Sequence, residues 1–304
     1  MTRLSRREFF RASGFIALGA FAAACAKKIG PGTGGGKTLK QITSGHQQTV
    51  QMNAAGVEIL SGVPDRLVFN LIDPSNGSPL TMPTVQVWIA PDTTSTATGP
   101  LTAQYRVNGL PADKGFYEVQ LTVPKDGTWL AVAIAQGSNR TDYGSAQFQV
   151  GRRTAMPKPG DHAVSVPTPT VKDHRGVNPI CTRTPPCSMH AVSLDTALKS
   201  GKPTVLIIAT PKFCTSALCG PETDVVQAVS KGFAGRMNFI HVEVYKDAKP
   251  TTIQQQLTSP AATAWHLDEE PAIYYIDASG IIKARTIGPA DQAEVQAAAT
   301  ALAG

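Results

Sequence analysis

The chain has 304 residues, of which 42% are hydrophobic and 16% are charged, so it has room for about two domains with ordinary cores. The formal net charge is +6, but the first 24 residues hold four of the 28 basic residues and one of the 22 acidic ones. The remaining basic residues form no run or stripe that would bind nucleic acid, so we expect no nucleic-acid partner.

The first 24 residues have the composition of a signal peptide. Arg6 and Arg7 precede an apolar run over 12–24, which is shorter than the roughly 20 residues that a membrane-spanning helix needs. This order resembles a twin-arginine export signal, which a receptor reads as an address. The run ends in Ala22-Ala23-Ala24-Cys25 and resembles the lipobox of bacterial lipoproteins, although Ala22 stands where Leu is usual. We therefore expect export, cleavage before Cys25, and an extracytoplasmic protein anchored to the cell membrane by a lipid on Cys25.

Residues 25–38 are rich in glycine and end in Gly36-Lys37-Thr38, which invites comparison with a phosphate-binding loop. That motif needs a glycine five positions before Gly36, and Pro31 stands there. We therefore interpret the segment as a flexible tether after the lipid anchor, and expect no bound nucleotide.

Residues 39–150 have the pattern of an all-β domain. Apolar and polar residues alternate at period two, and sequences such as Lys125-Asp126-Gly127 predict turns between the runs. The expected strands cover 56–60, 66–72, 84–90, 101–107, 117–123, 129–135 and 145–150. About seven short strands with this spacing predict an immunoglobulin-like sandwich. The sequence leaves open whether it is a spacer or a partner-binding module.

Residues 151–177 are rich in proline and predict an extended linker, and from residue 178 onward apolar strands alternate with helical patterns. Such alternation indicates an α/β domain. The expected elements are a buried strand at 203–209, a helix starting at Pro221, a strand at 237–245, a short helix at 260–267, a hairpin at 272–287 and a closing helix at 290–303.

This order resembles the thioredoxin family over about residues 192–304. The resemblance rests on a strand that ends in a loop with Cys214 and Cys219, on Pro271 just before a β-hairpin, and on the terminal helix. In that family the proline is cis and faces the cysteines, so Glu270-Pro271 is the expected cis bond. The spacing departs from the family, because thioredoxins place two residues between the cysteines and this chain places four.

The resemblance implies thiol–disulfide exchange with exported proteins. Cys214 would attack, Cys219 would resolve the mixed disulfide, and Pro271 would shape the substrate groove. The helix dipole and Lys212 favour a thiolate at this loop, whereas Glu222 and Glu270 oppose one.

Three other functions stay open. A peroxiredoxin-like peroxidase has the same cysteine spacing, but it needs a Thr three residues and a Pro seven residues before the reactive cysteine, where this chain has Pro211 and Ile207. Copper delivery would use a similar cysteine pair with a distant histidine, His241 or His266. The third is a non-catalytic surface module in which the disulfides are structural.

Four cysteines remain after Cys25, and an even number outside the cytoplasm predicts disulfides with three possible connectivities. Nearness in the sequence favours Cys181–Cys187 and Cys214–Cys219. We expect the first to be a structural bridge. For the second we favour redox exchange, since so short a loop stabilises a protein by only about 2 kcal/mol. No metal site and no cofactor are expected.

Overall fold

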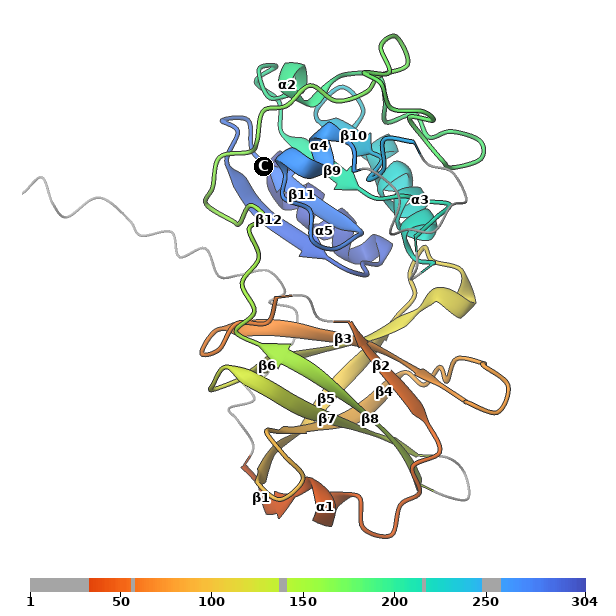
Figure 1. Cartoon of the computed structure of the whole chain (residues 1–304), viewed down its shortest axis with the longest axis vertical. Helices are drawn as coiled ribbons and strands as arrows, with labels where there is room; N and C mark the ends of the chain where they lie inside the picture. Colours follow the sequence, from red (N-terminus) through yellow and green to blue (C-terminus); the bar gives the residue numbers. More distant parts are fainter. Residues whose placement is uncertain (1–32, 56–57, 137–140, 215–216, 248–257) are drawn as a thin grey trace, which may run out of the picture. The chain divides into compact units, whose positions relative to one another are not determined.

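The computed structural model describes residues 33–304 except 56–57, 137–140, 215–216 and 248–257 (Figure 1). Arg6, Arg7 and Cys25, which carry the predictions of export and lipidation, lie outside the described residues. Where the structure describes the chain, no helix is both long and apolar enough to cross a membrane.

The first half of the described chain is built almost entirely of strands. These are β1 (Thr33–Thr38), β2 (Gln51–Ala55), β3 (Pro64–Ile72), β4 (Thr84–Ala90), β5 (Thr96–Arg106), β6 (Phe116–Thr122), β7 (Gly127–Gln136) and β8 (Thr141–Val150), with a short helix α1 (Leu39–Ile42) and a 3-10 turn η1 (Ala112–Lys114). Strands β3 to β8 confirm six of the seven expected strands. The expected strand at 56–60 lies partly on residues that the structure does not describe, and within it Ile59 forms one isolated bridge with Val150.

Hydrogen bonds join the strands into one barrel-like sheet in the order β2-β3-β6-β5-β4-β7-β8, with β1 beside β5. The segment that leads into β2 meets β8, because the Val50 N–H donates to the Tyr143 carbonyl at 3.4 Å and the Tyr143 N–H donates to the Gln47 carbonyl at 3.0 Å. Alternate residues of the strands fill the interior, as Leu67, Val87 and Ala133 do with no exposed surface.

This arrangement differs from the predicted sandwich, in which two sheets pack face to face without sharing hydrogen bonds. Strand β5 is the reason. Its residues 98–104 pair with β4, and its residues 104–106 pair with β6. This one long strand therefore joins the strands β2, β3 and β6 on one side to the strands β4, β7 and β8 on the other. The period-two pattern predicts each strand, but it does not predict that one strand pairs with neighbours from both sets.

The second half of the described chain alternates strands and helices, as expected. Its elements are α2 (Leu194–Ala197), β9 (Thr204–Ile208), α3 (Cys219–Ser230), η2 (Lys231–Phe233), β10 (Asn238–Val242), α4 (Pro260–Ala264), β11 (Ala272–Ile276), β12 (Ile282–Ile287) and α5 (Gln292–Ala303). Each one overlaps a predicted element, except that α2 adds a short turn before the predicted strand at 203–209 and η2 adds one directly after α3.

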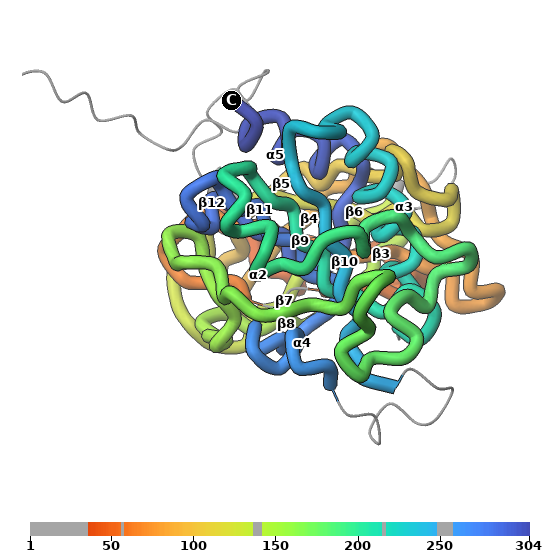
Figure 2. The backbone as a smooth tube through the Cα atoms, turned by 90° about the horizontal axis from the view of Figure 1, so that it is seen from above, coloured from red at the N-terminus to blue at the C-terminus, as the bar shows by residue number. Residues whose placement is uncertain are grey.

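The four strands form one sheet in the order β10-β9-β11-β12. Strand β9 runs parallel to β10 and antiparallel to β11, and β11 and β12 form a hairpin. Helices cover both faces, with α4 and α5 on opposite sides of the strands (Figure 2). Val205 and Ile207 face α3 and α5, whereas Leu206 and Ile208 face α2 and α4. The order and the strand directions confirm the thioredoxin-like fold expected for this region, and the Glu270–Pro271 bond is cis, as expected.

Part of the predicted linker packs against this sheet rather than running free. The Gly160 N–H donates to the Ile282 carbonyl and the Ala163 N–H donates to the Gly280 carbonyl, both at 2.8 Å. Such pairing fits a proline-rich segment, because proline is tolerated beside an edge strand. Residues Thr33–Gly304 form one compact unit, so the division of the chain into separate domains stays a prediction.

Candidate functional site

The Cys214–Cys219 disulfide lies between the end of β9 and the start of α3. Strand β9 is a wholly buried apolar run that ends at Ile208, and the chain then turns through a loop that carries Cys214. The two Cα atoms are 6.0 Å apart. Cys214 is half-buried and Cys219 is fully buried, so Cys214 holds the more accessible sulfur.

Helix α3 begins at Cys219, two residues before the predicted start at Pro221. Proline fits the first turn of a helix because its missing N–H would have no partner there. Since this is true at several positions of the first turn, Pro221 does not mark the first helical residue. The consequence is that Cys219 itself lies in the first turn, where the partial positive charge of the helix end favours a thiolate.

Glu270 is the side chain that meets the buried sulfur. Its Oε2 lies 3.6 Å from Cys219 Sγ and accepts a hydrogen bond of 2.7 Å from the Thr210 N–H. Burial raises the pKa of Glu270 to about 7, although the bond from Thr210 opposes the shift. A carboxyl group in this position can give or take a proton at neutral pH. The sequence identified Glu270 only as a charge that opposes a thiolate and missed this role.

The other residues expected at this site behave differently. Glu222 is fully buried in α3, and burial raises its pKa well above the ordinary value, so it does not oppose a thiolate by its charge. Lys212 is exposed, with its ammonium 5.7 Å from the centre of the Phe213 ring. Pro271 is buried, and its neighbour Glu270 makes the contact with Cys219.

Neither histidine considered for copper delivery joins this site. Among the residues that the structure describes, the ligating group that completes the set with Cys214 and Cys219 is Glu270. His266 is exposed after α4, and His241 lies beside the other cysteine pair.

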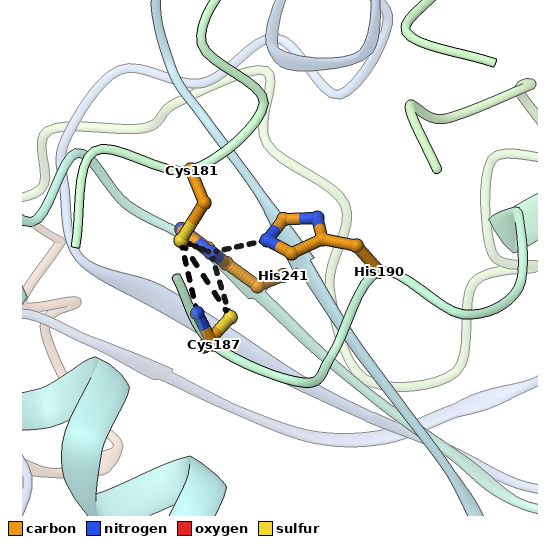
Figure 3. Close-up of side chains that lie close together, drawn as sticks. All are labelled: Cys181, Cys187, His190 and His241. Atoms are coloured by element: carbon orange, nitrogen blue, oxygen red, sulfur yellow. Dashed lines mark hydrogen bonds between the residues drawn. The ribbon is translucent and has the colours of Figure 1, made fainter. Parts of the chain in front are cut away.

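That pair does not form the predicted disulfide. Cys181 and Cys187 are free thiols whose sulfurs are 3.8 Å apart. His190 and His241 complete a cluster in which all four side chains are buried and point toward one another (Figure 3). The prediction of a Cys181–Cys187 bridge considered only their nearness in the sequence, whereas the fold surrounds both sulfurs with imidazole nitrogens.

Two parts of the fold build this cluster. Cys181, Cys187 and His190 come from the irregular segment before α2, and His241 comes from the middle of β10. Ile240 and Val242 face α4, so His241 between them faces the opposite side of the sheet. His241 Nδ1 lies 3.7 Å from the sulfur of Cys181, 3.4 Å from the sulfur of Cys187 and 3.2 Å from His190 Nε2.

The cluster is strongly polarised. A hydrogen bond from Cys187, together with contacts to both histidines, holds the pKa of Cys181 well below its ordinary value. The same bond and burial raise the pKa of Cys187 far above its own. Burial lowers the pKa of His190, which favours its neutral form. The cluster therefore offers one thiolate, one thiol and an imidazole nitrogen that can act as a ligand.

Sequence reasoning missed this cluster, although two signals were present. Cys187 and His190 are three residues apart, a common spacing for metal ligands, and His241 interrupts an otherwise apolar core strand. No pattern in the sequence links His241 to a segment about fifty residues earlier.

No family model and no curated protein matches the sequence. Among solved structures, the chain is similar to a thiol:disulfide interchange protein of the thioredoxin family from Chlorobium tepidum TLS, with 18% identity and a TM-score of 0.33. That similarity covers 50% of this chain and all of the other. It is also similar to titin M4, with 13% identity and a TM-score of 0.19, over 34% of this chain and 97% of the other. The fold assignment therefore rests on the strand order described above.

Proposed function

We propose that this protein exchanges disulfides with exported thiol proteins through Cys214 and Cys219, while a lipid on Cys25 holds it at the outer face of the cell membrane. One observation carries the proposal. A half-buried sulfur and a fully buried one are joined at the start of α3, and a carboxyl group with a pKa of about 7 lies beside the buried sulfur. A bridge that only stabilised the loop would not need a group that titrates at neutral pH.

The reaction runs in two steps when the reduced protein meets a substrate disulfide. The Cys214 thiolate attacks one substrate sulfur, so a Cys214–substrate bond forms and the other substrate sulfur leaves as a thiolate. Glu270 then takes the proton of Cys219, and the Cys219 thiolate attacks Cys214. This forms the Cys214–Cys219 bond and releases the second substrate sulfur. Two electrons pass to the substrate, and the reverse sequence oxidises a substrate dithiol.

Pro271 is proposed as a positioning residue for this chemistry. It is buried directly after Glu270, and its carbonyl accepts a hydrogen bond of 2.9 Å from the Gly288 N–H. These contacts fix the backbone that carries Glu270 at the start of β11, so the carboxyl group is held near Cys219.

The all-β region is proposed as a spacer between the anchor and the redox site. Within the part of the chain that the structure describes, both clusters of potential metal-ligating side chains lie after residue 180, and neither involves β1 to β8. We also propose that Arg6 and Arg7 form the signal that directs export.

Trapping of mixed disulfides tests the proposal. Cys219→Ala removes the resolving sulfur, so adducts between Cys214 and exported partners should accumulate and disappear on reduction. Cys214→Ala is the matched control and should carry few adducts, because its remaining sulfur is buried. Each variant would be isolated from cells and compared on gels with and without reductant.

Two results together would favour the non-catalytic surface module instead. One is the absence of reducible adducts on both variants. The other is a Cys214–Cys219 potential below about −300 mV, which is typical of structural bridges.

A further inference from the structure

The cluster of Cys181, Cys187, His190 and His241 has no part in the exchange reaction, yet all four side chains are buried. Their exposed fractions are 6%, 5%, 2% and 0%. Burying polar or ionised groups is costly unless they find partners, and here the sulfur and nitrogen atoms face one another. Four side chains that can each offer one ligand atom, with these atoms all within 4.8 Å of one another, are the donor set of a metal site.

The separations between the ligand atoms match tetrahedral coordination of zinc. With Zn–S bonds of about 2.3 Å and Zn–N bonds of about 2.05 Å, tetrahedral angles place two sulfurs about 3.8 Å apart, a sulfur and a nitrogen about 3.6 Å apart, and two nitrogens about 3.3 Å apart. The structure has 3.8 Å between the sulfurs, 3.7 and 3.4 Å from the sulfurs to His241 Nδ1, and 3.2 Å between the imidazole nitrogens.

The surroundings orient the ligands. His241 Nε2 lies 3.0 Å from the Ala209 carbonyl, and an N–H donated there leaves the lone pair of Nδ1 directed at the cluster. The Cys187 N–H also approaches the Cys181 sulfur at 3.4 Å, as backbone donors do around bound thiolates. Close by, the Glu243 carboxylate accepts a hydrogen bond from the Thr182 N–H and ties the residue after Cys181 to the end of β10.

Charge balance selects the metal. Two thiolates and two neutral imidazoles carry a charge of −2, which one Zn²⁺ cancels inside the buried site. Cu⁺ would leave an uncompensated negative charge in the same place, and burying such a charge is expensive. Four protein ligands complete the tetrahedron, so no coordination position is left for water or substrate. This is typical of a structural zinc site.

The geometry of the two cysteine pairs supports the same conclusion. Cys214 and Cys219 are joined by a disulfide, whereas the sulfurs of Cys181 and Cys187 are unbonded and 3.8 Å apart. If the protein works outside the cytoplasm, as the proposed function requires, an unprotected pair at that distance would oxidise to a disulfide. Coordination to zinc keeps both sulfurs as thiolates.

We infer that Cys181, Cys187, His190 and His241 bind one Zn²⁺ in a closed structural site. Binding displaces the thiol proton that remains on Cys187 to solvent and changes no oxidation state. The metal fastens residues 181–190 to β10. Through the 3.1 Å hydrogen bond from the Lys212 N–H to Thr182 Oγ1, it also supports the loop that carries Cys214.

Metal content and cobalt spectra test the site on the full-length protein. The purified protein should hold about one zinc per chain by mass spectrometry of its metals. After removal of zinc with a chelator, Co²⁺ should give the intense visible bands of tetrahedral coordination together with a thiolate-to-cobalt charge-transfer band. Addition of Zn²⁺ should abolish these bands.

Variants separate this site from the redox pair. His190→Ala and Cys187→Ser should each lose at least about nine-tenths of the zinc. The double variant Cys214→Ser with Cys219→Ser should keep it, so the result does not depend on the proposed exchange activity. If the first two variants fail to fold, the cobalt spectrum of the wild-type chain decides alone.

Any of three results would overturn the inference. One is a protein that holds no zinc, shows no cobalt bands and contains a Cys181–Cys187 disulfide. Another is retention of copper in preference to zinc. The last is loss of zinc from the Cys214, Cys219 double variant.

Discussion

The carboxyl group of Glu270 lies where it can exchange a proton with Cys219 when the Cys214–Cys219 disulfide opens. Cys219 is fully buried, so water does not reach its sulfur directly, and the thiolate that forms when the bond breaks needs a nearby proton. Glu270 Oε2 is 3.6 Å away. Because burial raises its pKa to about 7, the group is mostly protonated at pH 6 and mostly ionised at pH 8. It can therefore donate a proton on the acid side of neutrality.

Reduction of the disulfide by an external thiol should depend on this proton. As the thiolate attacks Cys214, Cys219 leaves and Glu270 protonates it. The rate constant, expressed per concentration of external thiolate, should fall as pH rises through about 7 in the wild type. Glu270→Gln should remove the inflection and slow reduction at pH 6 by roughly 100-fold, which is typical of a positioned proton donor. Stopped-flow measurement of tryptophan fluorescence or thiol release gives the profile.

Glu269→Gln is the matched control, since Glu269 is the exposed neighbour of the same residue type. It should keep an inflection near neutral pH and a rate close to wild type. A Glu270→Gln protein with the wild-type profile would show that Cys219 receives its proton from another source.

At the scale of elements, the loop that carries Cys214 follows β9, a strand that is buried on both faces. Val205 and Ile207 of β9 pack toward α3, and Leu206 packs toward α4, so any shift of β9 would move the loop after it. Because β9 also pairs with both β10 and β11, the strand is fixed on all sides. This rigidity keeps Cys214 and Cys219 near Glu270.

Shortening one buried side chain of β9 should therefore weaken the fold measurably. Val205 has no exposed surface, and Val205→Ala removes two buried methyl groups and leaves a small cavity. We expect a loss of about 2 kcal/mol in the free energy of unfolding. Val171→Ala is the control, because Val171 is 65% exposed, and its effect should stay within about 0.5 kcal/mol. Urea denaturation of both variants measures the difference, and equal effects would contradict the assigned burial of β9.

The sequence predicted elements better than it predicted their assembly. Strands such as β4 and β9 follow from local alternation or from a short apolar run, and both appear where expected. The pairing of β5 with both β4 and β6 depends on non-local hydrogen bonds, which no local pattern encodes. The same limit applies to His241, since a non-local backbone hydrogen bond from its N–H to the Met189 carbonyl joins β10 to the segment that carries Cys187 and His190.

At the scale of the whole molecule, the chain combines a barrel-like sheet with a thioredoxin-like sheet. The segment between them is partly bound, because Thr168 hydrogen-bonds with both Ser193 and Leu194 at the start of α2. The proposed exchange with exported proteins also requires that Cys214 and Cys219 reach the compartment of those proteins. The sequence before the described residues supplies the proposed address and anchor, so these two functions can be tested without disturbing either sheet.

Export should depend on Arg6 and Arg7 as a pair. A receptor that reads two adjacent arginines distinguishes them from lysines, although the charge is the same, because the planar guanidinium group forms a fixed set of hydrogen bonds. Arg6→Lys combined with Arg7→Lys should therefore leave full-length precursor in the cytoplasm. Arg3→Lys combined with Arg11→Lys is the matched control, with the same number of exchanges outside the pair, and should be exported and cleaved normally.

Cys25→Ser should pass the export step but lose the lipid, so the protein should be released from membranes or stay uncut. Cell fractionation followed by gel mobility and lipid labelling distinguishes these states. Normal arrival of the Arg6, Arg7 variant at the membrane surface would show that a different signal directs export, and membrane attachment of a cleaved Cys25→Ser protein would rule out the lipid anchor.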